Sequence, residues 1–378
     1  MITNTVHLSD KTKSEQIDLV EWYFEQGWTD GLPVVPPTPE KVEAMVAALG
    51  GQPEEVEARV PPRWGNLTRE VLAINMVMAG CKPEYAPVVR AAMLAMCDPH
   101  FNLNGIQATT HMAAPLLVVN GPIRSEIGLN AGANVFGSGN RANATIGRAI
   151  RLVLLNVGGA WPGELDKSTL GHPGKYTFCI AENEEASPWE PFHVQHGYHK
   201  DESTVSIFRG WVFVNSAGTA SKRTIGEEMC LNLSFIPPTN ASATIVMDPG
   251  IAKMLKENDG FEAKQEYSRW LSQNIKMPAE RYWGFDHVDW LVTPRAIQGI
   301  EPYATFQKAR PDELITPYHD PERINLVVVG GDTNPLWKYS EYSYQGSESI
   351  DRWRLIPTGM VCEDGKCGVP DPPVEYDE

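Results

Sequence analysis

The sequence lacks any apolar run long enough to cross a membrane. Its longest apolar stretches, at 116–119 and 326–329, fall far short of the roughly 20 residues that a spanning helix needs. The amino-terminal residues also lack the basic segment and apolar core of a secretory signal. We therefore expect a soluble, cytoplasmic protein.

Positive charge is scarce as well. Lysine and arginine total 32 against 48 aspartates and glutamates, so the formal net charge is −16, and no basic cluster reverses it locally. An acidic surface repels phosphate backbones. We therefore expect a small-molecule substrate, with neither nucleic acid nor a membrane as a partner. A local basic pocket for a small anion is compatible with this charge.

Cysteine is sparse, with six residues in 378, which does not indicate a disulfide framework. The one close pair, Cys362 and Cys367, is separated by four residues, a wider spacing than in the redox Cys-x-x-Cys motif. The pair falls in an acidic, proline-rich tail at 358–378, where exposure favours thiol chemistry. Both cysteines are redox candidates, and incidental tail cysteines are the alternative.

The remaining composition is that of a globular α/β protein, 42% hydrophobic and 21% charged. Residues 1–357 are predicted to form a single α/β domain with one large core, subdivided near 220–240. The 11 tryptophans and 30 prolines indicate large covered surfaces, which favours a homo-oligomer.

Short apolar runs predict strands at 54–60, 116–120, 176–181, 205–208, 211–214, 243–246 and 324–329. Helical periodicity predicts helices at 13–26, 38–50, 68–79, 83–97, 140–156, 249–258 and 261–275. This alternation predicts a mixed sheet with flanking helices.

A glycine- and asparagine-rich segment joins the predicted strand at 116–120 to the helix at 140–156. Four glycines occur between Gly128 and Gly139. Backbone N–H groups and a helix amino terminus in such a loop can hold a carboxylate, a phosphate or an oxyanion. The segment matches neither GxGxxG nor the P-loop pattern, so a tightly packed connection is the alternative. The predicted substrate-binding residues here are Asn120, Asn130, Asn134, Ser138, Asn140, Arg141 and Asn143.

Candidate acid–base residues lie on both sides of this segment. His111 precedes the strand at 116–120 and is a candidate general acid or base, with a core histidine as the alternative. The strand at 176–181 is flanked by the candidates His172, Lys175, Glu182, Asn183 and Glu184. Because alternate residues share a face, Glu182 and Glu184 are expected to project together. The alternative is a solvated acidic loop.

Two further features suggest ligand sites. His193, His196 and His199 recur at a spacing of three and could bind zinc on a helix, but Gly197 interrupts them and neither HExxH nor Cys-x-x-Cys is present. No metal ligand is therefore assigned, and no cofactor is identified. Separately, Gly330, Gly331 and Asp332 follow the strand at 324–329, at the sheet edge where α/β proteins commonly bind ligands, with an ordinary strand-to-loop turn as the alternative.

Three segments carry a family resemblance: 101–111, 139–148 and 171–189. They resemble an uncharacterised bacterial family associated with small proteins that bear a thiol or selenol in a U/C-Gly-Ser-Cys motif. The resemblance implies thiol-linked chemistry, oxidoreductase or lyase, and a thiol- or selenol-bearing partner. The chain itself does not contain that motif.

Three hypotheses follow from the sequence. The first is an enzyme that binds a small anionic substrate in the glycine- and asparagine-rich segment and transfers protons through histidine and glutamate. The second is a metal-dependent hydrolase or lyase that uses the region of His172 and His193. The third is a non-catalytic scaffold for a thiol-bearing partner.

Overall fold

The computed structural model describes residues 18–354 except 212, 217–221, 239 and 332. The tail, with Cys362 and Cys367, lies outside the described residues. None of the described helices is both long and apolar enough to cross a membrane.

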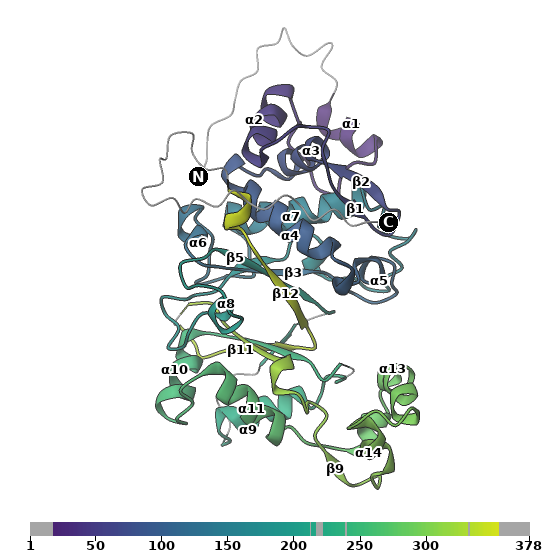
Figure 1. Cartoon of the computed structure of the whole chain (residues 1–378), viewed down its shortest axis with the longest axis vertical. Coiled ribbons are helices and arrows are strands. Elements are labelled where there is room, and N and C mark those ends of the chain that lie inside the picture. Colours follow the sequence, from purple (N-terminus) through teal and green to yellow (C-terminus); the bar gives the residue numbers. More distant parts are fainter. Residues whose placement is uncertain (1–17, 212, 217–221, 239, 332, 355–378) are drawn as a thin grey trace, which may run out of the picture.

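Two four-stranded mixed sheets form the centre of the fold (Figure 1). The first has the order β12 (Ser343–Ser349), β5 (Thr204–Arg209), β3 (Leu116–Asn120) and β4 (Cys179–Ala181), with β3 and β4 parallel. The second has the order β10 (Ile324–Val328), β7 (Ala243–Met247), β11 (Trp337–Ser340) and β6 (Val214–Asn215), with β10 and β7 parallel. The predicted α/β class with mixed sheets and flanking helices is confirmed.

The sheets pack face to face, with helices on both outer surfaces. Leu116 and Val118 of β3 pack against Val246 and Val327 of the second sheet. The alternate residue Leu117 faces the helices instead. Strand β3 is therefore buried on both faces. This agrees with its sequence, because residues 116–119 are all apolar. The result is a four-layer arrangement of helices, sheet, sheet and helices.

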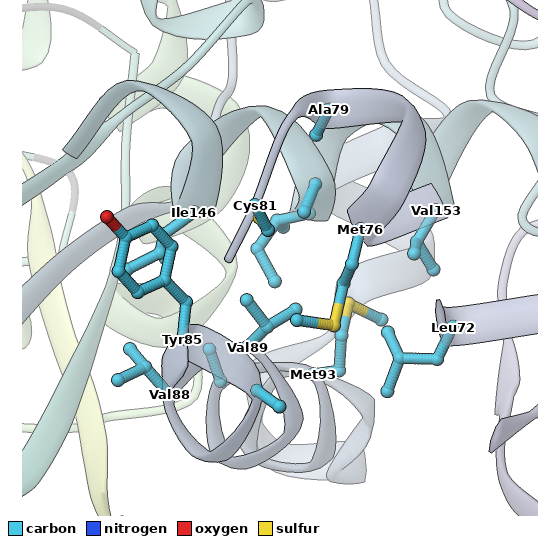
Figure 2. Close-up of a cluster of buried hydrophobic side chains, with 14 of the residues drawn as sticks. Leu72, Met76, Ala79, Cys81, Tyr85, Val88, Val89, Met93, Ile146 and Val153 are labelled. Carbon is cyan, nitrogen blue, oxygen red and sulfur yellow. The ribbon is translucent and has the colours of Figure 1, made fainter. Parts of the chain in front are cut away.

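Helices α3 (Arg69–Ala79), α4 (Ala86–Cys97) and α7 (Arg141–Asn156) cover the first sheet, and α2 (Pro39–Leu49) packs on α3. Figure 2 shows how Met76, Met93, Ile146 and Val153 from these three helices meet in one apolar cluster. On the far side, α9 (Ile225–Leu233), α10 (Pro249–Glu257) and α11 (Lys264–Asn274) cover the second sheet. The smaller elements are α1 (Leu19–Glu25), β1 (Val56–Val60), β2 (Gly65–Thr68), α5 (Leu103–Gln107), α6 (Ile123–Glu126) and α8 (Phe192–Gln195).

A helical lobe extends from the second sheet (Figure 1). It comprises α12 (Ala279–Trp283), α13 (Asp286–Ile297), α14 (Tyr303–Lys308) and the ribbon of β8 (Met277–Pro278) with β9 (Leu314–Ile315). The lobe has an apolar cluster of its own. The elements of the lobe were not predicted from the sequence, and neither were β11, β12 and α9.

Several predicted boundaries shift. The strand predicted at 176–181 begins only at Cys179, because Pro173–Lys175 forms a 3₁₀ turn before it. The strand predicted at 211–214 is the two-residue β6. The chain passes from the first sheet to the second between β5 and β6, before the predicted subdivision at 220–240, and β12 returns to the first sheet.

Candidate functional site

A cavity of about 670 Å³ lies where the glycine- and asparagine-rich segment meets the second sheet. We call it the loop pocket. Its wall is made by the loop 133–137, the carboxyl ends of β7 and β10, and strands β6 and β11. Because β7 and β10 are parallel, their carboxyl ends meet at one edge of the sheet, which is a common ligand position in α/β folds. The polar and charged lining residues are Asn134, Asn215, Ser216, Asp248, Thr333, Asn334 and Lys338.

Close backbone approach brings the loop against the turn that follows β10. The Gly330 N–H donates to the Ala131 carbonyl at 2.7 Å. A Cβ atom added to Gly331 would lie 3.1 Å from the Ala133 Cβ, so a larger residue would push the two segments apart. The Asn183 amide donates to the Gly330 carbonyl at 3.0 Å. The predicted ligand edge at Gly330 and the predicted loop thus share one pocket.

Most of the predicted amide side chains bind the loop's own backbone. Asn143 accepts from the Asn130 N–H at 2.8 Å and donates to the Asn130 carbonyl at 2.9 Å. Asn140 caps α7 through the Asn143 N–H and donates to the Gly128 carbonyl. Asn134, in the left-handed backbone region at φ 60°, lines the pocket, and its amide nitrogen donates to the Ser138 carbonyl. These amides therefore shape the loop.

Arg141, predicted as a cation of the pocket, points elsewhere. Its Nε and Nη2 atoms donate to the Gly80 carbonyl at 3.0 and 2.9 Å. Among the described lining residues the cation is Lys338 of β11, which was not predicted from the sequence. The Lys338 ammonium donates to Asn215 Oδ1 and lies 5.8 Å from the centre of the Phe136 ring. Burial lowers the pKa of Lys338.

Asp248 forms the acidic edge of the loop pocket and is held rigidly. Its Oδ1 atom accepts from the N–H groups of Gly250 and Ile251 at 2.7 and 3.1 Å, which caps α10. Its Oδ2 atom accepts from the Leu336 N–H. These backbone donors engage both carboxylate oxygens, which favours a positioning role for Asp248.

Glu182 and Glu184 meet in a second polar cluster, between the two sheets. We call this cluster the glutamate junction; its other members are Asn120, Arg124, His193 and Lys264. Glu182 is fully buried and bonds to Lys264 Nζ at 2.5 Å, to Asn120 Nδ2 at 2.6 Å and to the Phe192 N–H at 2.6 Å. Asn120 ends β3 and Glu182 follows β4, so the parallel pairing of these strands brings them together.

Glu184 binds the same nitrogen of the Asn120 amide as Glu182 does. Its Oε1 atom accepts from Asn120 Nδ2 and from the Gly121 N–H, each at 2.8 Å, and its Oε2 atom lies 2.9 Å from Arg124 Nη2. The expectation that Glu182 and Glu184 project together thus agrees with their shared contact to Asn120. Arg124 and Lys264, which neutralise these carboxylates, were not predicted from the sequence.

His193 lies beside the glutamate junction and is also fully buried. Its Nδ1 atom is 4.0 Å from Glu184 Oε1. Among the described residues, neither ring nitrogen of His193 has a hydrogen-bond partner, and the same is true of Asn120 Oδ1. The junction therefore retains free hydrogen-bonding capacity inside the protein.

His172 and Lys175 belong to a third cluster, near α7. Lys175 Nζ lies 2.5 Å from Asp166 Oδ2, and the Lys175 carbonyl accepts from Arg151 Nε at 2.9 Å. His172 Nδ1 accepts from the Gly174 N–H at 3.1 Å. Burial, reinforced by the positive charges of Lys175 and Arg151, lowers the pKa of His172 to about 4. His172 is therefore neutral at physiological pH.

Replacing His172 by Asn is expected to weaken the acid sensitivity of the fold. The pKa of His172 is about 4 in the folded protein, against an ordinary value of 6.5, so below pH 6.5 the unfolded chain takes up a proton that the folded chain does not. Stability is therefore lost as the pH falls from 6.5 towards 4. Asn removes the titration and retains an acceptor for the Gly174 N–H. Urea unfolding at pH 7, 5.5 and 4 measures the slope, and an unchanged slope contradicts this prediction.

His111 contacts the helical lobe. Its Nε2 atom lies 2.8 Å from Nε2 of His287 on α13, and its ring stacks on Trp211 with centroids 4.5 Å apart. At that distance the Nε2–H of one ring donates to the unprotonated Nε2 of the other. Burial and the adjacent His111 lower the pKa of His287, against the opposing effect of Asp286. His111 thus joins the lobe to the body of the protein.

The three histidines at a spacing of three lie in different environments. His193 is buried, His196 packs against Phe192 and Tyr344, and the side chain of His199 is 76% exposed beside Asp201. They do not form one ligand set. No cluster of three or more His, Cys, Asp or Glu suited to a metal ion occurs within the described part of the chain.

Apart from Arg141, the predicted site residues in the described part of the chain are therefore distributed over the glycine- and asparagine-rich loop, the glutamate junction, the cluster of His172 and the His111–His287 pair; of the predicted loop residues, Asn134 lines the loop pocket. Asn183 connects the loop pocket to the glutamate junction, because it lies between Glu182 and Glu184 and bonds to Gly330. Comparison of the chain with protein-family models, curated proteins and solved structures finds no match.

Proposed function

We propose that the chain is an enzyme that binds a small organic anion in the loop pocket. The observation that carries this proposal is the position of Lys338. It is a half-buried cation in a cavity at the carboxyl ends of parallel strands β7 and β10. An anionic ligand would restore to this ammonium the electrostatic stabilisation that it loses on leaving water.

The other lining residues define the kind of anion. Phe136, Val246, Leu336 and Trp337 supply apolar surface, while Asn134, Thr333 and Asn334 supply hydrogen-bonding groups. Pockets of this volume and composition bind small molecules that have an apolar part and a few fixed polar groups. A carboxylate with a short apolar or aromatic substituent fits these features best.

Lys338→Met is expected to weaken the binding of such an anion at least tenfold. A hydrogen bond to a charged group contributes about 1.5–3 kcal/mol, and about 1.4 kcal/mol corresponds to a factor of ten in affinity. A thermal-unfolding screen of small carboxylates, sulfonates and phosphates identifies the tightest ligand. Titration calorimetry then compares its dissociation constant for the wild type and the variant.

Lys253→Met is the matched control. Lys253 is an exposed residue of α10, and its replacement removes the same charge outside the lining of the loop pocket. Binding that weakens equally in both variants would reflect net charge rather than the pocket. Absence of any stabilising anion from the screen would contradict the proposed function.

Within this proposal the glutamate junction supports the pocket. Asn183 fixes the Gly330 carbonyl, and the flanking Glu182 and Glu184 anchor that segment between the sheets. His111, His172 and Lys175 are engaged in other contacts. The geometry thus favours Lys338 over these three residues as the reactive group of the pocket. The metal-dependent alternative has less support, because its histidines diverge.

A second candidate function is that of a subunit that assembles with other protein chains. Exposed apolar side chains on α13 favour it, with Trp290 65% and Ile297 72% exposed. Such a surface is typical of protein contacts. A second copy of the chain is the proposed occupant, and the thiol-bearing partner is the alternative. Light scattering after size exclusion tests this candidate: the mass of a single chain contradicts self-association.

A further inference from the structure

Lys338, which is half-buried, differs from the buried Lys264 and the half-buried Lys175 in the charge that faces it. Lys264 and Lys175 each bond to a carboxylate at 2.5 Å, through Glu182 and Asp166. Within the described part of the chain, Lys338 forms no ion pair, and its neighbours are the neutral Asn215 amide and the face of the Phe136 ring. A paired carboxylate therefore stabilises the ammonium of Lys264 and of Lys175, whereas no described carboxylate pairs with Lys338.

This environment favours a reactive amine. Burial in a partly apolar wall disfavours the ammonium and lowers the pKa of Lys338, which increases the fraction of neutral amine. A neutral lysine carries the lone pair that attacks carbonyl carbon, and lysines in apolar pockets serve as such nucleophiles. The loop pocket provides both the partial burial and the space for a substrate beside Lys338.

We propose that Lys338 forms an imine with the carbonyl carbon of a small 2-oxo acid in the loop pocket. This inference rests on the proposed function, of which it specifies the substrate class. The neutral amine adds to the carbonyl carbon to give a carbinolamine. Loss of the former carbonyl oxygen as water then leaves a C=N bond, so that one imine and one water form from one amine and one carbonyl. No electron transfer is involved.

The lining residues suit both ends of such a substrate. The carboxylate of a 2-oxo acid provides the anion that the proposed pocket requires, and Thr333 and Asn334 line the pocket with further hydrogen-bonding groups. Its substituent faces apolar surface from Leu336 and Trp337. When the imine nitrogen takes up a proton from solvent, its positive charge lies at the place of the ammonium, where the face of the Phe136 ring stabilises it.

Borohydride trapping tests the inference. The full chain is incubated with pyruvate or with phenylpyruvate, sodium borohydride is added, and peptides are mapped by mass spectrometry. Hydride reduces the imine carbon and leaves a stable secondary amine. We expect a stoichiometric adduct on Lys338 and none on exposed Lys253. Phenylpropionate has no ketone, so it should bind without an adduct and should protect Lys338 from phenylpyruvate.

The outcomes separate the inference from the proposed function. If pyruvate or phenylpyruvate stabilises the protein against heat but leaves no adduct on Lys338, the imine is refuted and the anion pocket stands. If neither acid binds or labels Lys338, the inference fails, and the anion screen alone tests whether the loop pocket binds an anion. Equal labelling of Lys253 and Lys338 shows that the reaction is unspecific and also overturns the inference. Lys338→Arg, which retains the charge, should abolish the adduct.

Discussion

Glu182→Gln is expected to lower the free energy of unfolding by about 3–5 kcal/mol, the usual cost of removing one partner of a buried ion pair. Gln keeps the shape of the side chain but removes the charge that neutralises Lys264. Both side chains are almost completely buried, at 0% and 2% exposure, so water cannot replace the lost partner. Chemical denaturation of the two proteins measures the difference.

Two further variants make this prediction specific. Glu43→Gln changes an exposed carboxylate of α2 and should leave stability within about 0.5 kcal/mol of the wild type. The double variant Glu182→Leu with Lys264→Met removes both buried charges and should recover part of the loss. A single variant as stable as the wild type would mean that the Glu182–Lys264 pair does not hold the two sheets together.

Gly121→Ala should destabilise the fold by roughly 2–5 kcal/mol, the sum of left-handed backbone strain and overpacking. Gly121 has a φ of +81°, and an added Cβ would lie 2.3 Å from the Glu202 carbonyl oxygen and 2.7 Å from the Ser203 Cα. Both are backbone atoms, which cannot rotate away as a side chain can. The Gly121 N–H also anchors Glu184, so the glutamate junction is expected to shift.

Gly128→Ala is the matched control for this substitution. Gly128 has a similar φ of +67°, but an added Cβ would meet no atom within 4 Å. Only the backbone strain of about 1–2 kcal/mol should remain. Thermal unfolding of both variants separates conformational strain from close packing. Equal losses in the two variants would contradict the close approach of Gly121 to the segment at 202–203.

The strongly apolar strands and the amphipathic helices could be predicted from the sequence. The strand at 116–120 and the helix at 140–156 appear with nearly the expected limits, because a doubly buried strand is apolar at every position and α7 is apolar along one side. The lobe was missed because α13 exposes Trp290 and Leu291 while it buries Val288 and Val292. Its apolar residues therefore do not define one face.

The site was only partly predictable, for a different reason. A spacing of two residues led us to expect Glu182 and Glu184 to lie together, although β4 ends at Ala181 and their shared contact is Asn120. Parallel strand ends indicated the ligand edge at Gly330. Lys264 lies 82 residues after its partner Glu182, and Lys338 lies 8 residues after Gly330. No local pattern in the sequence marks either lysine as part of a site. The pairing of His111 with His287 spans 176 residues and depends on the lobe.

The loop pocket and the glutamate junction make different contributions. The junction joins the carboxyl ends of β3 and β4 to β10 through Glu182, whose Oε1 atom also faces the Val328 N–H. The next residue after Glu182, Asn183, donates to the Gly330 carbonyl and so contacts the wall of the loop pocket. Changes at the junction should therefore act mainly on stability, whereas changes at Lys338 should act mainly on ligand binding.

A crystal structure of the complex with the tightest-binding anion from the screen tests the central claim most directly. We predict density for the ligand in the loop pocket, with its anionic group in contact with Lys338 and the loop 133–137, and an unchanged Glu182–Lys264 pair behind it. A ligand bound elsewhere, with Lys338 still bonded to Asn215 and the loop pocket filled only by water, would contradict the claim.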